Sequence, residues 1–121
     1  MNTRSSDDTH RGLFINTLVS GTNAHLLLQP GIKLGTSSIG KSRGLMLHIA
    51  REALQTGQLQ SVLERRFESA VALSGCYIYL DGQNNLIIWH SMPQQAAAVD
   101  RVFSRLLWLA GLSALDVPAN R

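Results

Sequence analysis

The stretch from residue 67 to residue 109 constrains the fold more than any other part of the chain. A helical pattern is followed by an alternating apolar run at 76–80, which is typical of a strand. Turn-forming residues at 81–85 lead into a second apolar run at 86–89, as in a β-hairpin. A strongly apolar helical pattern follows Pro93. This order predicts an α+β domain in which helices pack on a small sheet.

The second run of the hairpin, 86–89, is apolar on both faces, which predicts a strand inside the sheet. The last helix is expected to begin with a capping box, because Ser91 is followed three residues later by Gln94. Its core stripe consists of Val99, Val102, Phe103, Leu106 and Ala110. Trp108 extends the polar side, and further apolar positions are Leu107, Leu109 and Leu112. A helix that is apolar nearly all round favours a buried interface.

A middle helix is predicted from Gln58 to Ser74-Gly75, because glycine commonly terminates helices. Its apolar face consists of Leu59, Val62, Leu63, Phe67, Ala70 and Val71. Its polar face carries Glu64, Arg65 and Glu68. We interpret the adjacent pair Arg65-Arg66 as part of a solvated helix face.

The first twenty residues give a weaker pattern. Residues 1–9 are predicted to form a disordered polar tail. A short helix is expected from about residue 9 to residue 20, with helical spacing supplied by Leu13, Phe14, Thr17 and Leu18. Gly21 and Asn23 mark its end. A strand is the alternative, since Ile15, Thr17 and Val19 alternate equally well.

A second hairpin is predicted where two short apolar runs, 25–28 and 32–34, flank Pro30-Gly31. Residues 36–44 are rich in Gly and Ser without apolar periodicity, and they predict a loop. Residues 45–50 fit either a strand or the start of a helix, because both periods are present.

The chain has 121 residues, and we predict one domain at 10–117 followed by a tail at 118–121. Its net charge of +3 is spread over dispersed basic residues without interleaved aromatic ones, so nucleic-acid binding is only a minor alternative. No apolar run approaches the roughly 18 residues that a membrane span needs. The first eight residues lack the apolar core of a secretory signal. With the single Cys76, these features predict a cytoplasmic protein.

Residues 35–42, Gly-Thr-Ser-Ser-Ile-Gly-Lys-Ser, match the phosphate-loop pattern letter for letter. In such a loop, glycine amides surround the phosphates, the lysine neutralises their charge, and the serine hydroxyl ligates magnesium. A small nucleotide-binding protein that uses Gly40, Lys41 and Ser42 is therefore one hypothesis. Asp81, at the end of an apolar run, offers a further magnesium ligand.

Three observations favour a flexible polar loop over that hypothesis. The upstream strand follows a Pro-Gly turn and carries Lys33, unlike a buried central strand. Asp81 precedes Gly82 in a tight turn, where Asp-Gly is expected for local reasons. A parallel sheet also needs a crossover of about a dozen residues for each added strand, and the chain after residue 42 is too short to supply them.

No other residues suggest catalysis, a metal or a cofactor. The four histidines, His10, His25, His48 and His90, lack metal-ligand spacing. Cys76 is expected to be a buried structural thiol. Tyr77 and Tyr79 share one strand face and are expected to pack across strands.

The succession 67–71, Gly75-Cys76, 77–81 and 86–89, followed by a long apolar helix, resembles type III secretion chaperones of the Tir-chaperone (CesT-like) class. It is most similar to the small ones encoded in hrp/dsp clusters of plant-pathogenic bacteria. The basic charge and the short region before residue 43 resemble a related group better, the chaperone-like regulators of hrp clusters. These bind a regulatory protein and thereby control expression of secretion genes.

The resemblance implies an α+β fold with a twisted antiparallel sheet and flanking helices. It also implies a non-enzymatic homodimer that binds a secreted effector or a regulatory protein along apolar grooves. On this basis the expected partner-binding residues are Leu26, Leu28, Leu34, Leu107, Trp108 and Leu112. The expected dimer-interface residues are Leu59, Leu63, Tyr77, Tyr79 and Trp89.

Overall fold

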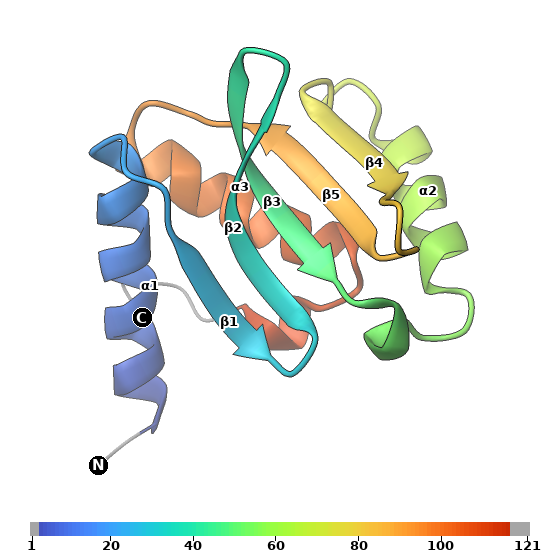
Figure 1. Cartoon of the computed structure of the whole chain (residues 1–121), viewed down its shortest axis with the longest axis horizontal. Helices are drawn as coiled ribbons and strands as arrows, with labels where there is room; N and C mark the ends of the chain where they lie inside the picture. Colours follow the sequence, from blue (N-terminus) through green and yellow to red (C-terminus); the bar gives the residue numbers. More distant parts are fainter. Residues whose placement is uncertain (1–2, 117–121) are drawn as a thin grey trace.

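The computed structural model describes residues 3–116, with side chains from residue 10 onward, and shows an antiparallel sheet flanked by helices (Figure 1). The main elements are α1 (Thr3–Val19), β1 (His25–Gln29), β2 (Ile32–Ile39), β3 (Ser42–Ile49), α2 (Gln58–Glu68), β4 (Cys76–Leu80), β5 (Leu86–Ser91) and α3 (Ala96–Leu109). Two short 3-10 helices, η1 (Arg51–Ala53) and η2 (Ser113–Leu115), complete the set. The predicted α+β class is confirmed.

The five strands lie in the order β1-β2-β3-β5-β4, and every neighbouring pair is antiparallel. β5 therefore lies inside the sheet, as its apolar faces predict. The hairpin around Pro30-Gly31 also forms, with Gln29 paired to Ile32. Residues 45–50 resolve in favour of the strand, since β3 pairs along its length with both β2 and β5.

The core lies between α3 and one face of the sheet, and α3 crosses that face diagonally (Figure 1). Leu45, Leu47 and Ile49 of β3 alternate toward it and have no exposed surface, as expected for a strand buried on one face. α1 packs against α3 and β1, and α2 packs against the other end of α3. From α3 the core receives Val99, Val102, Phe103, Leu106, Leu107 and Leu109.

The predicted loop at 36–44 is wrong, because these residues form the β2–β3 hairpin. Ile39 pairs with Ser42, which leaves only Gly40 and Lys41 to make the turn. Gly40 has a φ of +60°, and glycine at the first central position suits the turn types that match strand twist. A run of small polar residues therefore forms an exposed strand end, because partner strands satisfy its backbone.

The helix boundaries also differ from the sequence prediction. α1 begins at Thr3, so the disordered tail predicted at 1–9 is wrong for residues 3–9. Residues 1–2 and the predicted tail at 118–121 lie outside the described part of the chain. α2 ends at Glu68, and residues 69–75 form turns that lead into β4.

The capping box predicted at Ser91 does not form. Ser91 is the last residue of β5 and pairs with Gly44. α3 begins later, with Gln95 as its N-cap residue and no side-chain capping bond. Strand pairing of Ser91 outweighs the local capping pattern because it adds to a continuous ladder.

None of the helices within residues 3–116 has the length and apolarity that crossing a bilayer requires.

Candidate partner-binding surfaces

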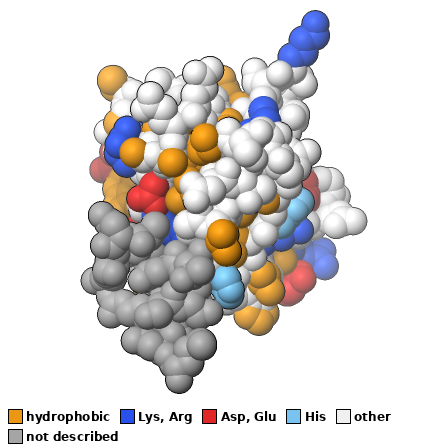
Figure 2. Space-filling model, turned by 90° about the vertical axis from the view of Figure 1, so that its left-hand side faces the viewer, with side chains coloured by type: hydrophobic (Ala, Val, Ile, Leu, Met, Phe, Trp, Pro, Cys, Tyr) orange, Lys and Arg blue, Asp and Glu red, His pale blue; other side chains and the backbone are white. Residues whose placement is uncertain are grey.

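Charged side chains are dispersed on the α1 side of the molecule. On the described part of the face in Figure 2, Lys and Arg side chains are separated by uncharged and acidic ones. This arrangement differs from the continuous basic stripe that phosphate backbones require. Among residues 10–116, two grooves with apolar lining are candidate binding surfaces.

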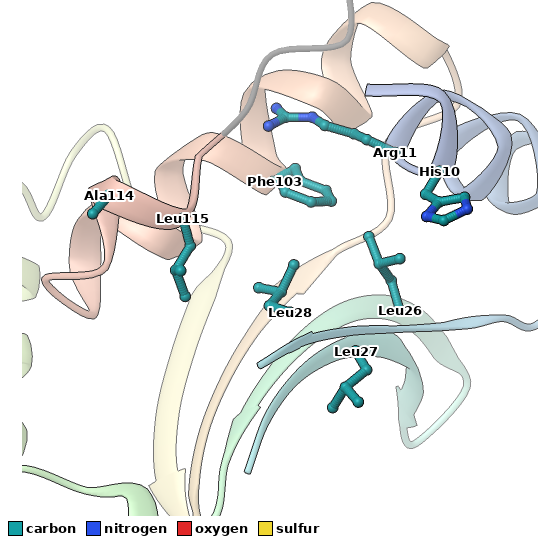
Figure 3. A pocket seen from close by; sticks show the side chains of 8 residues that line it. All are labelled: His10, Arg11, Leu26, Leu27, Leu28, Phe103, Ala114 and Leu115. Atoms are coloured by element: carbon teal, nitrogen blue, oxygen red, sulfur yellow. The ribbon is translucent and has the colours of Figure 1, made fainter. Parts of the chain in front are cut away.

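The first is a groove between α1, β1 and η2, of about 210 Å³. Leu26 and Leu28 point from β1 toward Phe103 and Leu115, whereas Leu27 points to the other side of the strand (Figure 3). Period-2 alternation of the strand produces this division. Leu26 and Leu28 are half-buried, so each retains exposed apolar surface inside the groove.

Arg11 closes the end of this groove and is almost completely buried. Its Nε atom donates to Asp100 Oδ1 at 2.9 Å, and its Nη1 atom donates to Asp116. Nη2 donates to Ser104 Oγ at 2.9 Å, and the guanidinium lies 3.9 Å from the centroid of the Phe103 ring. Arg11 thus connects α1 with α3 and with the segment after η2, because its planar fork has several donors that can reach acceptors on both.

The second apolar surface lies on α2. Leu59, Leu63 and Phe67 follow one another at four-residue spacing and form a ridge along the helix, which we call the apolar ridge. Phe67 is 83% exposed and Leu63 48%, and Val71 just beyond the helix is 93% exposed. Of the apolar face predicted for this helix, only Val62 is fully buried.

Next to the apolar ridge runs a polar one, formed by Gln60, Glu64 and Glu68, which we call the acidic ridge. The two ridges line an open groove of about 670 Å³. Gln60 Nε2 donates to Glu64 Oε1 at 2.9 Å. Within residues 10–116, neither glutamate of this ridge forms an ion pair.

The two arginines of α2 do not form a solvated face, contrary to the sequence interpretation. Arg65 Nη1 donates to the Leu109 carbonyl oxygen at 3.1 Å. Arg66 Nε donates to the Cys76 carbonyl oxygen at 3.1 Å. Both side chains are half-buried, because they satisfy carbonyl groups at the end of α3 and the start of β4. The exposed charge left on α2 is therefore acidic.

The sequence model of the HrpV-like family matches residues 1–115. The chain belongs to the HrpV-like family. This family is associated with type III secretion and with hrp regulation. No curated protein and no solved structure matches the chain.

In this HrpV-like chain, two of the predicted partner-binding residues are buried. Leu34 and Leu107 have no exposed surface, so these two predictions are wrong. Leu34 points from β2 into the core, and Leu107 lies on the side of α3 that faces it. Trp108 is 44% exposed, beside a groove of about 510 Å³ between α3 and residues 69–73. Leu112 is half-buried.

Among the predicted dimer residues of the HrpV-like chain, Trp89 is corrected. It is only 2% exposed, although it points to the sheet face opposite the core. Its indole lies over Gly44, where an added Cβ would approach the ring to 2.1 Å. Its Nε1 atom donates to the Ser37 carbonyl oxygen at 3.1 Å. Tyr77 packs on it with ring centroids 5.6 Å apart, which confirms cross-strand packing for Tyr77.

The other dimer candidates keep accessible surface. Tyr77 is 55% exposed and Tyr79 39%, and Leu59 is half-buried. Leu63 belongs to the apolar ridge described above. Homodimerisation of the HrpV-like chain stays a prediction.

The remaining side chains with reactive or ligating groups are buried or take part in local turns. Burial raises the pKa of the Cys76 thiol to about 11, as expected for a structural thiol. Hydrogen bonds lower the pKa of Asp81, chiefly the one from the Asn85 side chain, followed by backbone amides. Asp81 therefore organises its own turn. Among residues 10–116, no group of three or more His, Cys, Asp or Glu is placed to hold a metal ion.

The nucleotide-binding hypothesis loses its structural basis. A phosphate loop needs free backbone amides between a strand and a helix, whereas Gly40, Lys41 and Ser42 belong to a tight turn between two antiparallel strands. No helix follows this turn, because β3 begins directly at Ser42.

Proposed function

We propose that this HrpV-like chain is a non-enzymatic, chaperone-like protein-binding module that acts in the cytoplasm. It controls expression of hrp type III secretion genes by binding another protein of the secretion system. The bacterium is expected to be a plant pathogen that carries an hrp cluster. Membership of the HrpV-like family favours a regulatory protein over a secreted effector as the partner.

The observation that carries this proposal is the exposure of apolar side chains on and after α2. Phe67 and Val71 leave most of their surface in water, at 83% and 93%. Isolated exposed apolar residues are ordinary, but a contiguous row with a groove beside it marks a protein interaction site. Apolar side chains spaced three or four residues apart along a helix are also the usual anchors in helix-mediated protein recognition.

The half-buried leucines of β1 support the same proposal. Leu26 and Leu28 line a small groove beside β1, and β1 lies at the opposite end of the molecule from α2 (Figure 1). Such a groove accepts one or two apolar side chains of an extended segment. A partner that reaches both surfaces binds more tightly than one that reaches a single surface.

The test uses Phe67→Glu in a bacterium that carries an hrp cluster. The tagged wild-type chain is expected to co-purify with one specific protein of the secretion system and to change the activity of an hrp promoter reporter. Phe67→Glu is expected to lose both properties, because a charge replaces the most exposed ring of the apolar ridge.

The matched control is Leu13→Glu, which places the same charge on another exposed apolar residue, 61% exposed on α1. It is expected to retain the partner and the reporter response. Circular dichroism of both variants verifies that the fold is intact. Retention of partner and regulation by Phe67→Glu contradicts the proposal.

A further inference from the structure

We propose that the two ridges of α2 bind a basic amphipathic helix of a different protein, and not a second copy of this chain, so that Leu59 and Leu63 belong to the partner interface in place of the dimer interface expected from the sequence. This inference rests on the proposed function and deepens it by specifying the chemistry of the partner. A helix that fits presents apolar side chains to the apolar ridge and Lys or Arg side chains to the acidic ridge.

The spacing of the ridges defines the length of the partner. Leu59 and Phe67 are eight positions apart, which corresponds to about 12 Å along a helix axis. The acidic ridge runs beside it with the same four-residue spacing, from Gln60 to Glu68. A partner helix of three to four turns, about 14 residues, covers both ridges.

Charge is the argument for a basic partner. The chain is basic overall, with a net charge of +3, yet the exposed part of α2 carries Glu64 and Glu68. The other acids with described side chains are mostly engaged. Asp100 and Asp116 bind Arg11, and Asp81 holds its own turn. Glu52 is the remaining one, and it lies in η1 beside a different groove.

The same charge argues against a second copy. In an antiparallel two-fold pairing of apolar ridges, identical flanks face one another, so Glu64 and Glu68 of both copies meet. Like charges facing each other oppose association. In a parallel pairing, the acidic flank of one copy would face the opposite flank of the other copy, which carries Arg66. Arg66 is not available for that contact, because its Nε atom donates to the Cys76 carbonyl oxygen.

The probe is a synthetic 14-residue amphipathic helix of leucine and lysine, and its counterpart carries glutamate in place of every lysine. Fluorescence anisotropy at about 0.15 M salt is expected to show the lysine peptide binding about tenfold more tightly or better, because charges near a surface interact over this range. The glutamate peptide has the same apolar face and controls for nonspecific hydrophobic binding.

Variants of the chain locate the effect. Glu68→Lys is expected to weaken binding of the lysine peptide about fivefold, and Glu64→Lys/Glu68→Lys to abolish its advantage over the glutamate peptide. Glu68 forms no hydrogen bond or ion pair within residues 10–116, so its replacement leaves the fold intact. Glu52→Lys makes the same change in net charge elsewhere and is expected to leave both affinities unchanged.

Two results in vitro overturn this inference. One is equal affinity for the two peptides, or a preference that survives in Glu64→Lys/Glu68→Lys. The other is a wild-type homodimer in analytical ultracentrifugation that Phe67→Glu dissociates, since the apolar ridge is then occupied by a second copy. If Phe67→Glu loses the host partner while Glu64→Lys/Glu68→Lys retains it, the proposed function stands and the basic partner is rejected.

Discussion

At the scale of single residues, Trp89 is buried on a sheet face that none of the α-helices within residues 3–116 covers (Figure 1), because its indole packs directly against the backbone of Gly44. Its ring is buried on the sheet face opposite α3 because Gly44 has no side chain to displace it. The indole thereby covers β3 and finds a hydrogen-bond acceptor on β2. An aromatic ring across a strand glycine protects backbone that would otherwise be exposed.

Replacing this glycine tests the contact. Gly44→Ala is expected to destabilise the fold by about 1–3 kcal/mol, because a new Cβ overlaps the indole and forces it away. Urea unfolding followed by fluorescence measures the loss. Gly82→Ala is the control, since nothing lies within 4 Å of an added Cβ there, and its effect is expected to stay within about 0.5 kcal/mol. Equal stabilities for the two variants contradict the role of Gly44.

The single cysteine gives a second test at this scale. Cys76 is 1% exposed, and burial raises the pKa of its thiol from 9.0 to about 11. Reaction with a disulfide reagent near pH 8 is expected to be about tenfold slower, or more, in the native chain than in urea, because the thiolate is the reactive form. If the Cys76 thiol of the native chain reacts as fast as in urea, the prediction of a buried, unreactive thiol is contradicted.

The same pKa shift predicts how stability depends on pH. A raised thiol pKa means that the folded state favours the protonated form. Stability linked to Cys76 is therefore fully present below pH 9 and declines as the pH rises toward 11. Cys76→Ser is expected to remove this decline, which unfolding measurements across the alkaline range reveal.

At the scale of elements, α1 is held by Arg11 as well as by apolar packing. Phe14, Ile15 and Leu18 enter the core, and Arg11 connects the helix with Asp100 of α3 across 89 residues of sequence. A buried guanidinium is tolerated only where acceptors surround it. The docking of α1 therefore combines apolar packing with the long-range polar cluster around Arg11.

Arg11→Ala tests this dependence. It is expected to cost about 2 kcal/mol, which is less than a fully buried pair because both carboxylates are partly exposed. Hydrogen exchange is expected to accelerate in α1 first and to leave β3 and β5 protected. Arg101→Ala, at an exposed position of α3, serves as the control. Uniform acceleration throughout the chain is the result that contradicts a local role.

The β2–β3 hairpin makes a prediction about nucleotides. Isothermal titration with magnesium-ATP is expected to show no binding heat, because the amides near Lys41 lie in a strand ladder and a tight turn. Lys41→Ala is accordingly expected to retain partner binding and hrp regulation. Saturable heat that disappears in Lys41→Ala revives the nucleotide hypothesis.

At the scale of the whole molecule, the core is complete without Phe67 of the apolar ridge. Leu106→Ala is expected to cost about 2–5 kcal/mol, because it opens a cavity at a position with no exposed surface. Phe67→Ala is expected to change stability by less than about 0.5 kcal/mol, although it removes the larger side chain. Chemical denaturation of both variants measures the difference. A large loss for Phe67→Ala assigns its ring to the core and removes the proposed interface.

The sequence predicted the fold class and most strands correctly because those signals are local. Alternation marks β4, a run that is apolar on both faces marks β5, and Pro30-Gly31 marks a turn wherever it occurs. The candidate surface was only partly predicted. Leu63 and Trp108 are exposed as expected, whereas Leu34 and Leu107 are buried, and Phe67 was not among the predicted site residues.

The error at Leu107 and the omission of Phe67 share a cause, since both residues lie on helices. Helical periodicity shows which residues lie on one face, but not which face meets the core. On α2 the inward side is set by Arg65 and Arg66, whose guanidinium groups reach carbonyls of α3 and β4. Such contacts join residues that are far apart in sequence, so no local pattern contains them.

By itself, the sequence determined that strands and helices alternate in this order, since turn residues and apolar periods act over a few positions. Only the tertiary structure decided which apolar residues remain outside. The packing of α3 on the sheet buries Leu34 and Leu107, and the docking of α2 through Arg65 and Arg66 leaves Phe67 in water. Burial depends on the packing of whole elements against one another, and that packing is a property of the assembled chain.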